Sequence, residues 1–167
     1  MNLDHELIDA VYYNKPLQKI ETLVQKGADI HTENDRCIKD ATNNDRLDII
    51  KYLIKKGADI HVENDYPLRK ASFIGNISIV KYLVEKGADI HALDDHALQI
   101  ANVNHYDDIV EYLIEKGSYP TQDMYLDENV QEKAILNNPS CITFILNLTD
   151  SLKKKYSAYI ELTNLGL

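Results

Sequence analysis

Three histidines recur at one place in a repeated sequence, and histidine is a residue type that binds metal ions and transfers protons. His31, His61 and His91 follow one another at intervals of 30 residues. Equivalent side chains in stacked repeats are separated by helix-packing distances of about 8–10 Å per repeat, so the three cannot share one ion. We therefore predict that these histidines bond the neighbouring loop and that the protein holds no metal. The aspartates two positions earlier are expected to bond nearby backbone amides: Asp29, Asp59 and Asp89.

A second group has the residue types of an acid–base catalyst. His105 lies close in sequence to Asp107 and Asp108, but no nucleophile accompanies them. The sequence also lacks a glycine-rich phosphate loop, a Cys-x-x-Cys pair and a strand-turn-helix nucleophile motif. These observations predict a protein that is not an enzyme and needs no cofactor.

The charge of the chain limits its partners. The 167 residues include 27 acidic and 18 basic ones, for a formal net charge of −9. Such a protein repels phosphate backbones and anionic lipid, so we expect neither nucleic acid nor membrane as a partner, and a basic or polar protein fits better. The basic run at 153–155 is interpreted as a solvated helix face.

The sequence also indicates where the protein works. No stretch approaches the roughly 18 apolar residues that span a membrane, and residues 1–6 show no basic flank followed by an apolar stretch, so we expect no signal peptide. Cys37 and Cys141 lie far apart in a repeat protein, so we expect two free thiols in a reducing compartment. The expected location is therefore intracellular.

All these residues are positioned by a unit that repeats every 30 residues. The hexapeptide Lys-Gly-Ala-Asp-Ile-His occurs at 26–31, 56–61 and 86–91, and a decayed copy follows at 116–120. Upstream of each copy, apolar residues are spaced i, i+3 and i+4, which predicts a packed helix, and the Lys-Gly pair is typical of its C-terminal end. A shorter apolar segment, clearest at 67–75, precedes that helix. Each unit is therefore predicted to be a helix, a tight turn, a second helix and a loop.

This unit resembles the ankyrin repeat, and residues 79–91 look especially like the ankyrin proteins of giant DNA viruses of amoebae, of the mimivirus type. The resemblance covers about residues 5–120. It implies an all-α fold, a solenoid of paired antiparallel helices, in a single domain spanning 1–167. The expected repeats occupy about 5–31, 35–61, 65–91 and 95–120, followed by a degenerate repeat and a capping helix in 121–167.

The chain departs from the ankyrin pattern in its loops and at its C-terminal end. Ten residues lead from Gly57 to Pro67, three fewer than in the usual unit, so the loops between repeats should be shortened to tight turns. After the fourth repeat the period fails. There we predict helices over about 125–136 and 140–148, with Ala134 as a candidate core residue.

The ankyrin pattern leaves two freely varying positions at the end of each inner helix, and in the family these positions line the concave groove that meets partners. Large apolar side chains have no structural need there, so they are candidate anchors, with asparagines as adaptable hydrogen-bonding groups. The candidates at these positions are Tyr13, Asn14, Asn43, Asn44, Phe73, Ile74, Val103 and Asn104. The loop tips Arg36, Tyr66 and His96 are expected to flank the same groove. In an alternative arrangement, the shortened loops fold over Phe73 and Ile74 and bury them.

We interpret the protein as a monomeric module that binds another protein through this concave face, in the host cytoplasm if the chain is viral. A second hypothesis, suggested by the resemblance to viral ankyrin proteins, is a substrate-recruiting adaptor whose C-terminal segment docks a cellular machine such as a ubiquitin ligase. Its support is apolar content near the end of the sequence: Tyr156, Tyr159, Ile160, Leu162, Leu165 and Leu167. Against it, residues 118–167 contain no F-box-like motif. The partner's identity does not follow from the sequence, because one repeat architecture binds unrelated targets.

Overall fold

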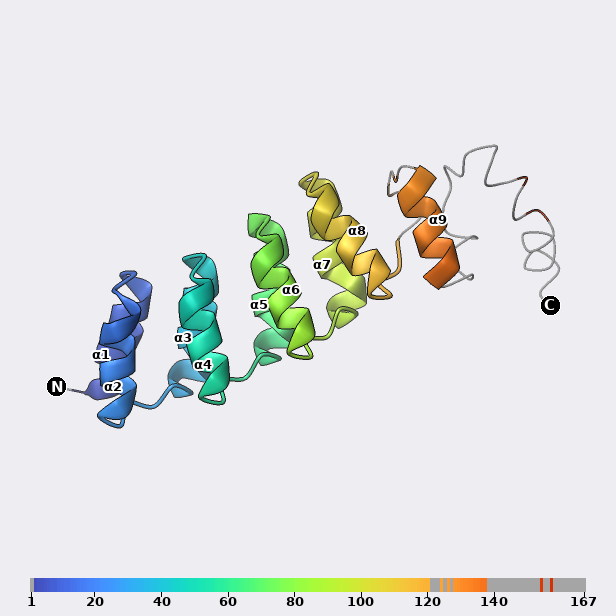
Figure 1. Cartoon of the computed structure of the whole chain (residues 1–167). Coiled ribbons are helices and arrows are strands. Elements are labelled where there is room, and N and C mark those ends of the chain that lie inside the picture. Colours follow the sequence, from blue (N-terminus) through green and yellow to red (C-terminus); the bar gives the residue numbers. More distant parts are fainter. Residues whose placement is uncertain are drawn as a thin grey trace. The chain divides into compact units, whose positions relative to one another are not determined.

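The computed structural model describes residues 2–120, Met124, Leu126, 128–137, Lys154 and Ser157 (Figure 1). Over these residues it contains nine α-helices and no β-strand, which confirms the predicted all-α repeat fold. The chain divides into two compact units, here called unit 1 (Met1–Asp89) and unit 2 (Ile90–Leu167). The single-domain prediction and the predicted repeat boundaries stay predictions. None of the described helices is long and apolar enough to cross a membrane.

Unit 1 consists of three helix pairs, in which the first helix is called inner and the second outer. The pairs are α1 (Leu3–Tyr12) with α2 (Leu17–Gln25), α3 (Thr32–Asn43) with α4 (Leu47–Lys55), and α5 (Val62–Ile74) with α6 (Ile77–Glu85). Helix α3 contacts both α1 and α5, and α2 contacts α4. Neighbouring repeats of unit 1 therefore pack inner helix against inner helix, and the first two repeats also contact each other through their outer helices.

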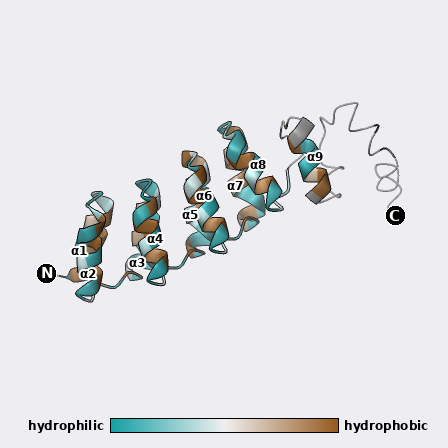
Figure 2. Ribbon diagram, viewed as in Figure 1, coloured by the Kyte–Doolittle hydropathy of each residue, from teal (hydrophilic) through white to brown (hydrophobic). Residues whose placement is uncertain are grey.

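The outer helices form because their apolar residues recur with helical spacing. Ile50 and Leu53 of α4 are fully buried, as are Val80 and Leu83 at the equivalent places in α6. Hydrophobic and hydrophilic bands alternate along the ribbons in Figure 2, as this spacing requires. Each outer helix is followed by a lysine and then a glycine with positive φ, 102° at Gly57, which confirms the predicted stop signal.

One left-handed residue joins the two helices of every pair. This residue is Asn14, Asp45, Gly75 or His105, with φ of 54°, 58°, 86° and 59° respectively. The turns of adjacent repeats are tied together, because the amide of Asn76 donates a hydrogen bond to Asp45 at 2.7 Å. The Oδ1 atom of Asn76 also accepts the backbone N–H groups of Ser78 and Ile79 and so caps α6.

Unit 2 contains α7 (Ala92–Val103), α8 (Asp107–Glu115) and α9 (Glu128–Asn137). Helix α8 contacts both α7 and α9. Helix α9 overlaps the helix predicted over 125–136, and Ala134 is buried as predicted.

Helix α9 is also held to α8 by charge. Lys133 donates hydrogen bonds to Glu111 and to Glu115, the latter at 2.9 Å, and these bonds raise the pKa of the Lys133 ammonium group. The helix predicted over 140–148, the predicted capping helix, Cys141 and the apolar residues from 156 onward lie outside the described residues.

Candidate functional site

In each of the inner helices α3, α5 and α7, the second to fourth residues are left-handed. Their φ angles lie between 51° and 59°, and the residues are 33–35, 63–65 and 93–95. In α3 the backbone N–H of Asp35 closes this turn on the carbonyl of His31 at 3.1 Å. Most non-glycine residues avoid this conformation, whereas asparagine and aspartate tolerate it, and they fill the last two positions of all three turns. The shortened loop predicted from the sequence is thus a single left-handed turn.

This turn corrects the expected positions of three candidate residues. Arg36, Tyr66 and His96 do not lie at loop tips. Each one directly follows the left-handed turn and belongs to the first right-handed turn of an inner helix. The reason is that the left-handed turn brings the chain back within three residues, so the helix begins earlier than a projecting hairpin would allow.

The aspartate that ends each left-handed turn is buried and holds the loop of the following repeat. In each case its carboxylate accepts a backbone N–H from a residue 24 positions later. The pairs are Asp35 with Asp59 at 2.9 Å, Asp65 with Asp89 at 2.8 Å, and Asp95 with Tyr119 at 3.1 Å. Asp4 makes the equivalent bond to the N–H of Asp29 at 2.8 Å. These four aspartates were not predicted from the sequence, although each precedes an inner-helix apolar segment at the same distance.

The three repeated histidines contact these same aspartates. Each distance runs from the Nδ1 atom of the histidine to the Oδ1 atom of the aspartate. It is 3.0 Å for His31 and Asp35, 3.1 Å for His61 and Asp65, and 3.0 Å for His91 and Asp95. The predicted bond to a neighbouring loop is therefore wrong for the side chains of His31 and His61, because the carboxylate makes the hydrogen bond to the next repeat. The ring of His91 does contact the next loop, since it stacks on Tyr119 with ring centroids 4.9 Å apart. The expected role of Asp29 and Asp59 is confirmed, since they accept the N–H groups of His31 and His61 at 2.9 and 2.8 Å.

The other chemical candidates can be placed as well. His105, Asp107 and Asp108 are exposed at the turn between α7 and α8. Within the described part of the chain, no three His, Cys, Asp or Glu side chains converge as a metal ion would require. Cys37 is buried in α3, and this burial, reinforced by the charges of Asp40 and Asp35, raises the pKa of its thiol to about 12.

The first repeat is shifted by one residue relative to the others at the end of its inner helix. Asn14 is left-handed like Asp45, so Tyr12 and Tyr13 occupy the places of Asn43 and Asn44. The prediction that Tyr13 and Asn14 fill the two varying positions is therefore wrong by one residue. The cause is Pro16, an additional residue between this turn and α2. A signal was present in the sequence, because the buried inner-helix alanines at 10, 41, 71 and 101 are spaced by 31, 30 and 30 residues.

Large apolar side chains are exposed at these varying positions. In unit 1 the exposed fractions are 53% for Tyr12, 65% for Tyr13 and 51% for Phe73, and in unit 2 Val103 is 74% exposed. Tyr12 and Tyr13 form an edge-to-face pair with ring centroids 5.1 Å apart. Ile74 is half-buried. The alternative in which shortened loops bury Phe73 is therefore wrong.

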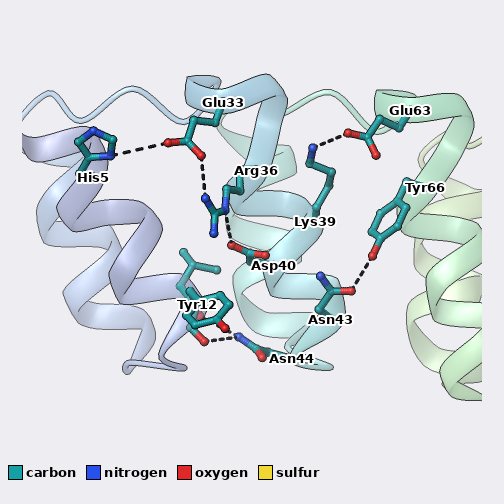
Figure 3. A network of polar contacts seen from close by, with 11 residues as sticks. His5, Tyr12, Glu33, Arg36, Lys39, Asp40, Asn43, Asn44, Glu63 and Tyr66 are labelled. Carbon is teal, nitrogen blue, oxygen red and sulfur yellow. Dashed lines mark hydrogen bonds and ion pairs between the residues drawn. The ribbon is translucent and has the colours of Figure 1, made fainter.

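The polar candidates on α3 are joined to neighbouring inner helices (Figure 3). Tyr66 of α5 donates its hydroxyl to Asn43 at 2.8 Å, and Lys39 donates to Glu63 at 2.6 Å. Arg36 donates to Glu33 at 2.7 Å and to Asp40 at 3.2 Å. The hydrogen bond from Lys39 lowers the pKa of Glu63, and the one from Arg36 lowers the pKa of Glu33. Two side-chain hydrogen bonds thus join α3 to α5, and the bonds of Arg36 lie within α3.

Three of the candidate asparagines are engaged at helix ends. Asn44 donates its amide to the carbonyls of Val11 and Tyr12 at 2.9 and 3.0 Å, which ties α3 to the end of α1. Asn14 accepts a hydrogen bond from Arg46. Asn104 donates to the carbonyl of Ile100 in its own helix at 2.8 Å. Their predicted role in partner binding stays a prediction.

Comparison with known proteins adds one finding. A family model described as ankyrin repeats (3 copies) matches residues 7–94 and, in a second placement, residues 38–124. A search of curated proteins found no match to the chain. The matched residues extend from α1 to beyond α8 and include all three left-handed turns.

Proposed function

The chain belongs to the ankyrin-repeat family, and from this premise we propose that it is a non-catalytic module that binds another protein through the concave face of its inner helices. Ankyrin repeats generally mediate protein–protein interaction. A rigid repeat surface favours this role, because little conformational entropy is lost when a partner docks on ordered helices.

The observation that carries the proposal is the exposure of aromatic side chains at the ends of the inner helices. Tyr12, Tyr13 and Phe73 lie more than half exposed on unit 1, at positions where packing does not require aromatic residues. Aromatic side chains supply much of the binding energy in protein interfaces, because they bury a large area with few rotatable bonds. They are therefore the anchors that we assign to the partner, with Asn43 beside them as an adaptable polar group.

The proposal also includes further residues of the binding face, the oligomeric state, the location and the source of the protein. We include Arg36, Tyr66 and Ile74 in the binding face of unit 1, and His96 and Val103 in that of unit 2. A monomeric state, an intracellular location and a viral source with a host-protein partner complete the proposal. The adaptor hypothesis depends on residues after 150, outside the described part of the chain, and stays a prediction.

An affinity purification tests the proposed function. The native protein and a Tyr12→Ala/Phe73→Ala variant are used as bait in an amoeba lysate, and the bound proteins are identified by mass spectrometry. Circular dichroism and thermal melting establish that the variant is folded. A matched control, Lys51→Ala/Lys55→Ala, changes two exposed residues of outer helix α4.

We expect a specific partner that the control retains and the inner-helix variant loses. A partner that binds the folded inner-helix variant as well as the native protein would contradict the assignment of the binding face. The absence of any specific partner for the native protein would contradict the binding function itself.

A further inference from the structure

Four residues of inner helix α5 form one surface with a chemistry of its own. Tyr66, Arg69, Lys70 and Phe73, here called the α5 face, follow the helical spacing i, i+3, i+4 and i+7. We propose that the α5 face binds an acidic peptide segment of the partner, one that carries an aromatic or aliphatic anchor. This inference rests on the proposed function and names the chemistry of the partner.

The adjacent inner helices α3 and α5 differ in how their basic residues are paired. The inner helices of unit 1 carry four basic residues, two on α3 and two on α5. On α3, Arg36 pairs with Glu33 and Asp40, and Lys39 pairs with Glu63 (Figure 3). Among the described residues, no carboxylate lies within ion-pair distance of Arg69 or Lys70. The positive charge of α5 is therefore available to a partner.

The two acidic residues of α5 have partners of their own. Glu63 accepts a hydrogen bond from Lys39, and Asp65 is buried between His61 and the backbone N–H of Asp89. Both carboxylates of α5 are thus engaged within the protein, and neither forms an ion pair with Arg69 or Lys70. The α5 face is locally positive although the whole chain has a formal net charge of −9.

The local charge decides the contact, because ions in physiological salt screen charges beyond about 8 Å. The expectation of a basic partner, which rests on net charge, therefore does not extend to this face. An acidic segment that docks here pairs with Arg69 and Lys70. The acidic remainder of the surface repels the segment and so disfavours binding at other positions.

Aromatic rings hold the two cations of the α5 face in place. Lys70 places its Nζ atom 4.7 Å from the ring centroid of Phe73, and the guanidinium of Arg69 lies 5.9 Å from the ring centroid of Tyr66. Arg69 also donates to the carbonyls of Asn64 and Glu63 at 2.9 and 2.8 Å. Two positioned cations beside a half-exposed phenyl ring match a segment that combines carboxylates with an apolar anchor.

The test is selection of displayed random dodecapeptides on the intact protein, followed by fluorescence anisotropy with the selected peptides in synthetic form. We expect enriched sequences in which Asp or Glu flanks an aromatic or aliphatic residue.

Lys70→Gln should weaken binding of these peptides about threefold, and Arg69→Gln/Lys70→Gln about tenfold. Phe73→Ala should also weaken it about tenfold. Lys70→Gln touches no hydrogen bond of the described residues, so its effect reports on the face and not on folding.

A charge-matched control is available on outer helix α4. Lys51→Gln/Lys55→Gln removes two exposed lysines and changes the net charge by the same amount, so binding should stay within about twofold of the native value. A rise in salt from about 0.05 to about 0.5 M should weaken the native complex more than that of Arg69→Gln/Lys70→Gln.

Several outcomes would overturn the inference. If the selected peptides lack acidic residues but still fail to bind Phe73→Ala, the proposed function stands and the proposal of an acidic partner is contradicted. Failure to select any peptide would also remove it, while the lysate experiment decides the proposed function independently. Tight binding of a uridine oligonucleotide that Lys70→Gln weakens would assign the face to a phosphate backbone instead.

Discussion

The carboxylate of Asp65 accepts a hydrogen bond from the backbone N–H of Asp89 at 2.8 Å, across 24 residues of sequence. The other contact of this carboxylate is the ring nitrogen of His61 at 3.1 Å. Because Asp65 is only 4% exposed, the bond ties the left-handed turn of one repeat to the loop that ends the next one. Stability in repeat proteins depends on such contacts between nearest neighbours.

Replacement of Asp65 by alanine should therefore destabilise the protein by about 2–4 kcal/mol, since it leaves a backbone N–H without its acceptor and removes a charged hydrogen bond. Urea denaturation measures the loss. Asn64→Ala is the matched control, because Asn64 has the same left-handed conformation and is exposed. Equal losses in the two variants would contradict the role of the carboxylate.

Asn43 and Asn44 are adjacent but should differ in their effect on stability. Asn44→Ala removes two hydrogen bonds to the carbonyls at the end of α1 and should cost about 1–2 kcal/mol. Asn43→Ala removes one exposed hydrogen bond from Tyr66 and should cost less than about 0.5 kcal/mol. Thermal melting of both variants gives the comparison, and a reversed order would show that α1 is not capped in this way.

Leu93 provides a test of the left-handed turn in unit 2. Its φ angle is 53° and its side chain is 52% exposed, so Leu93→Gly should relieve backbone strain at little cost in burial. We expect a neutral effect or a gain of up to about 1 kcal/mol. Val103→Gly changes an exposed residue in the right-handed end of the same helix and should instead lose about 0.5–1 kcal/mol. A clear loss of stability in Leu93→Gly would argue against the turn.

The thiol of Cys37 should be inert in the folded protein. With its pKa raised to about 12 from an ordinary value of 9.0, the thiolate at neutral pH is scarcer by roughly a thousandfold. In a Cys141→Ala background, Ellman's reagent should modify Cys37 only after guanidinium unfolding. Rapid modification of the native protein would show that Cys37 is accessible.

The same raised pKa has a consequence for stability. A group whose pKa is higher in the folded state favours folding fully below its unfolded pKa, and this contribution disappears as the pH rises from about 9 toward 12. The difference in stability between the Cys141→Ala protein and its Cys37→Ala derivative should therefore be constant below about pH 9 and shrink above it. A difference in the free energy of unfolding that grows as the pH rises would contradict a raised pKa of Cys37 in the folded state.

The one-residue shift of the first repeat can be tested on the partner that the lysate experiment identifies. Tyr12→Ala should weaken partner binding by about tenfold, because Tyr12 occupies the position of Phe73 in the first repeat. Asn14→Gly should leave binding unchanged, since Asn14 is the left-handed residue of the turn. Calorimetric titration of both variants decides between the two registers.

Much of the fold followed from local patterns. The spacing of residues such as Ile50 and Leu53 predicted the outer helices, and the Lys-Gly pairs predicted where these helices end. The exposure of Phe73 was left open, because a sequence contains no information on how far a shortened loop reaches over its neighbour. Only the observed left-handed turn excluded burial of this side chain.

The sequence by itself determined which segments are helical and which faces are apolar, because the helical spacing of apolar residues can be seen within a few turns of one segment. The tertiary structure alone decided that Asp65 holds the following loop and that Lys39 is ion-paired while Arg69 is not. Each of these facts depends on which atoms of one repeat meet those of the next. Stacking sets that register, and the spacing of residues within a single repeat does not.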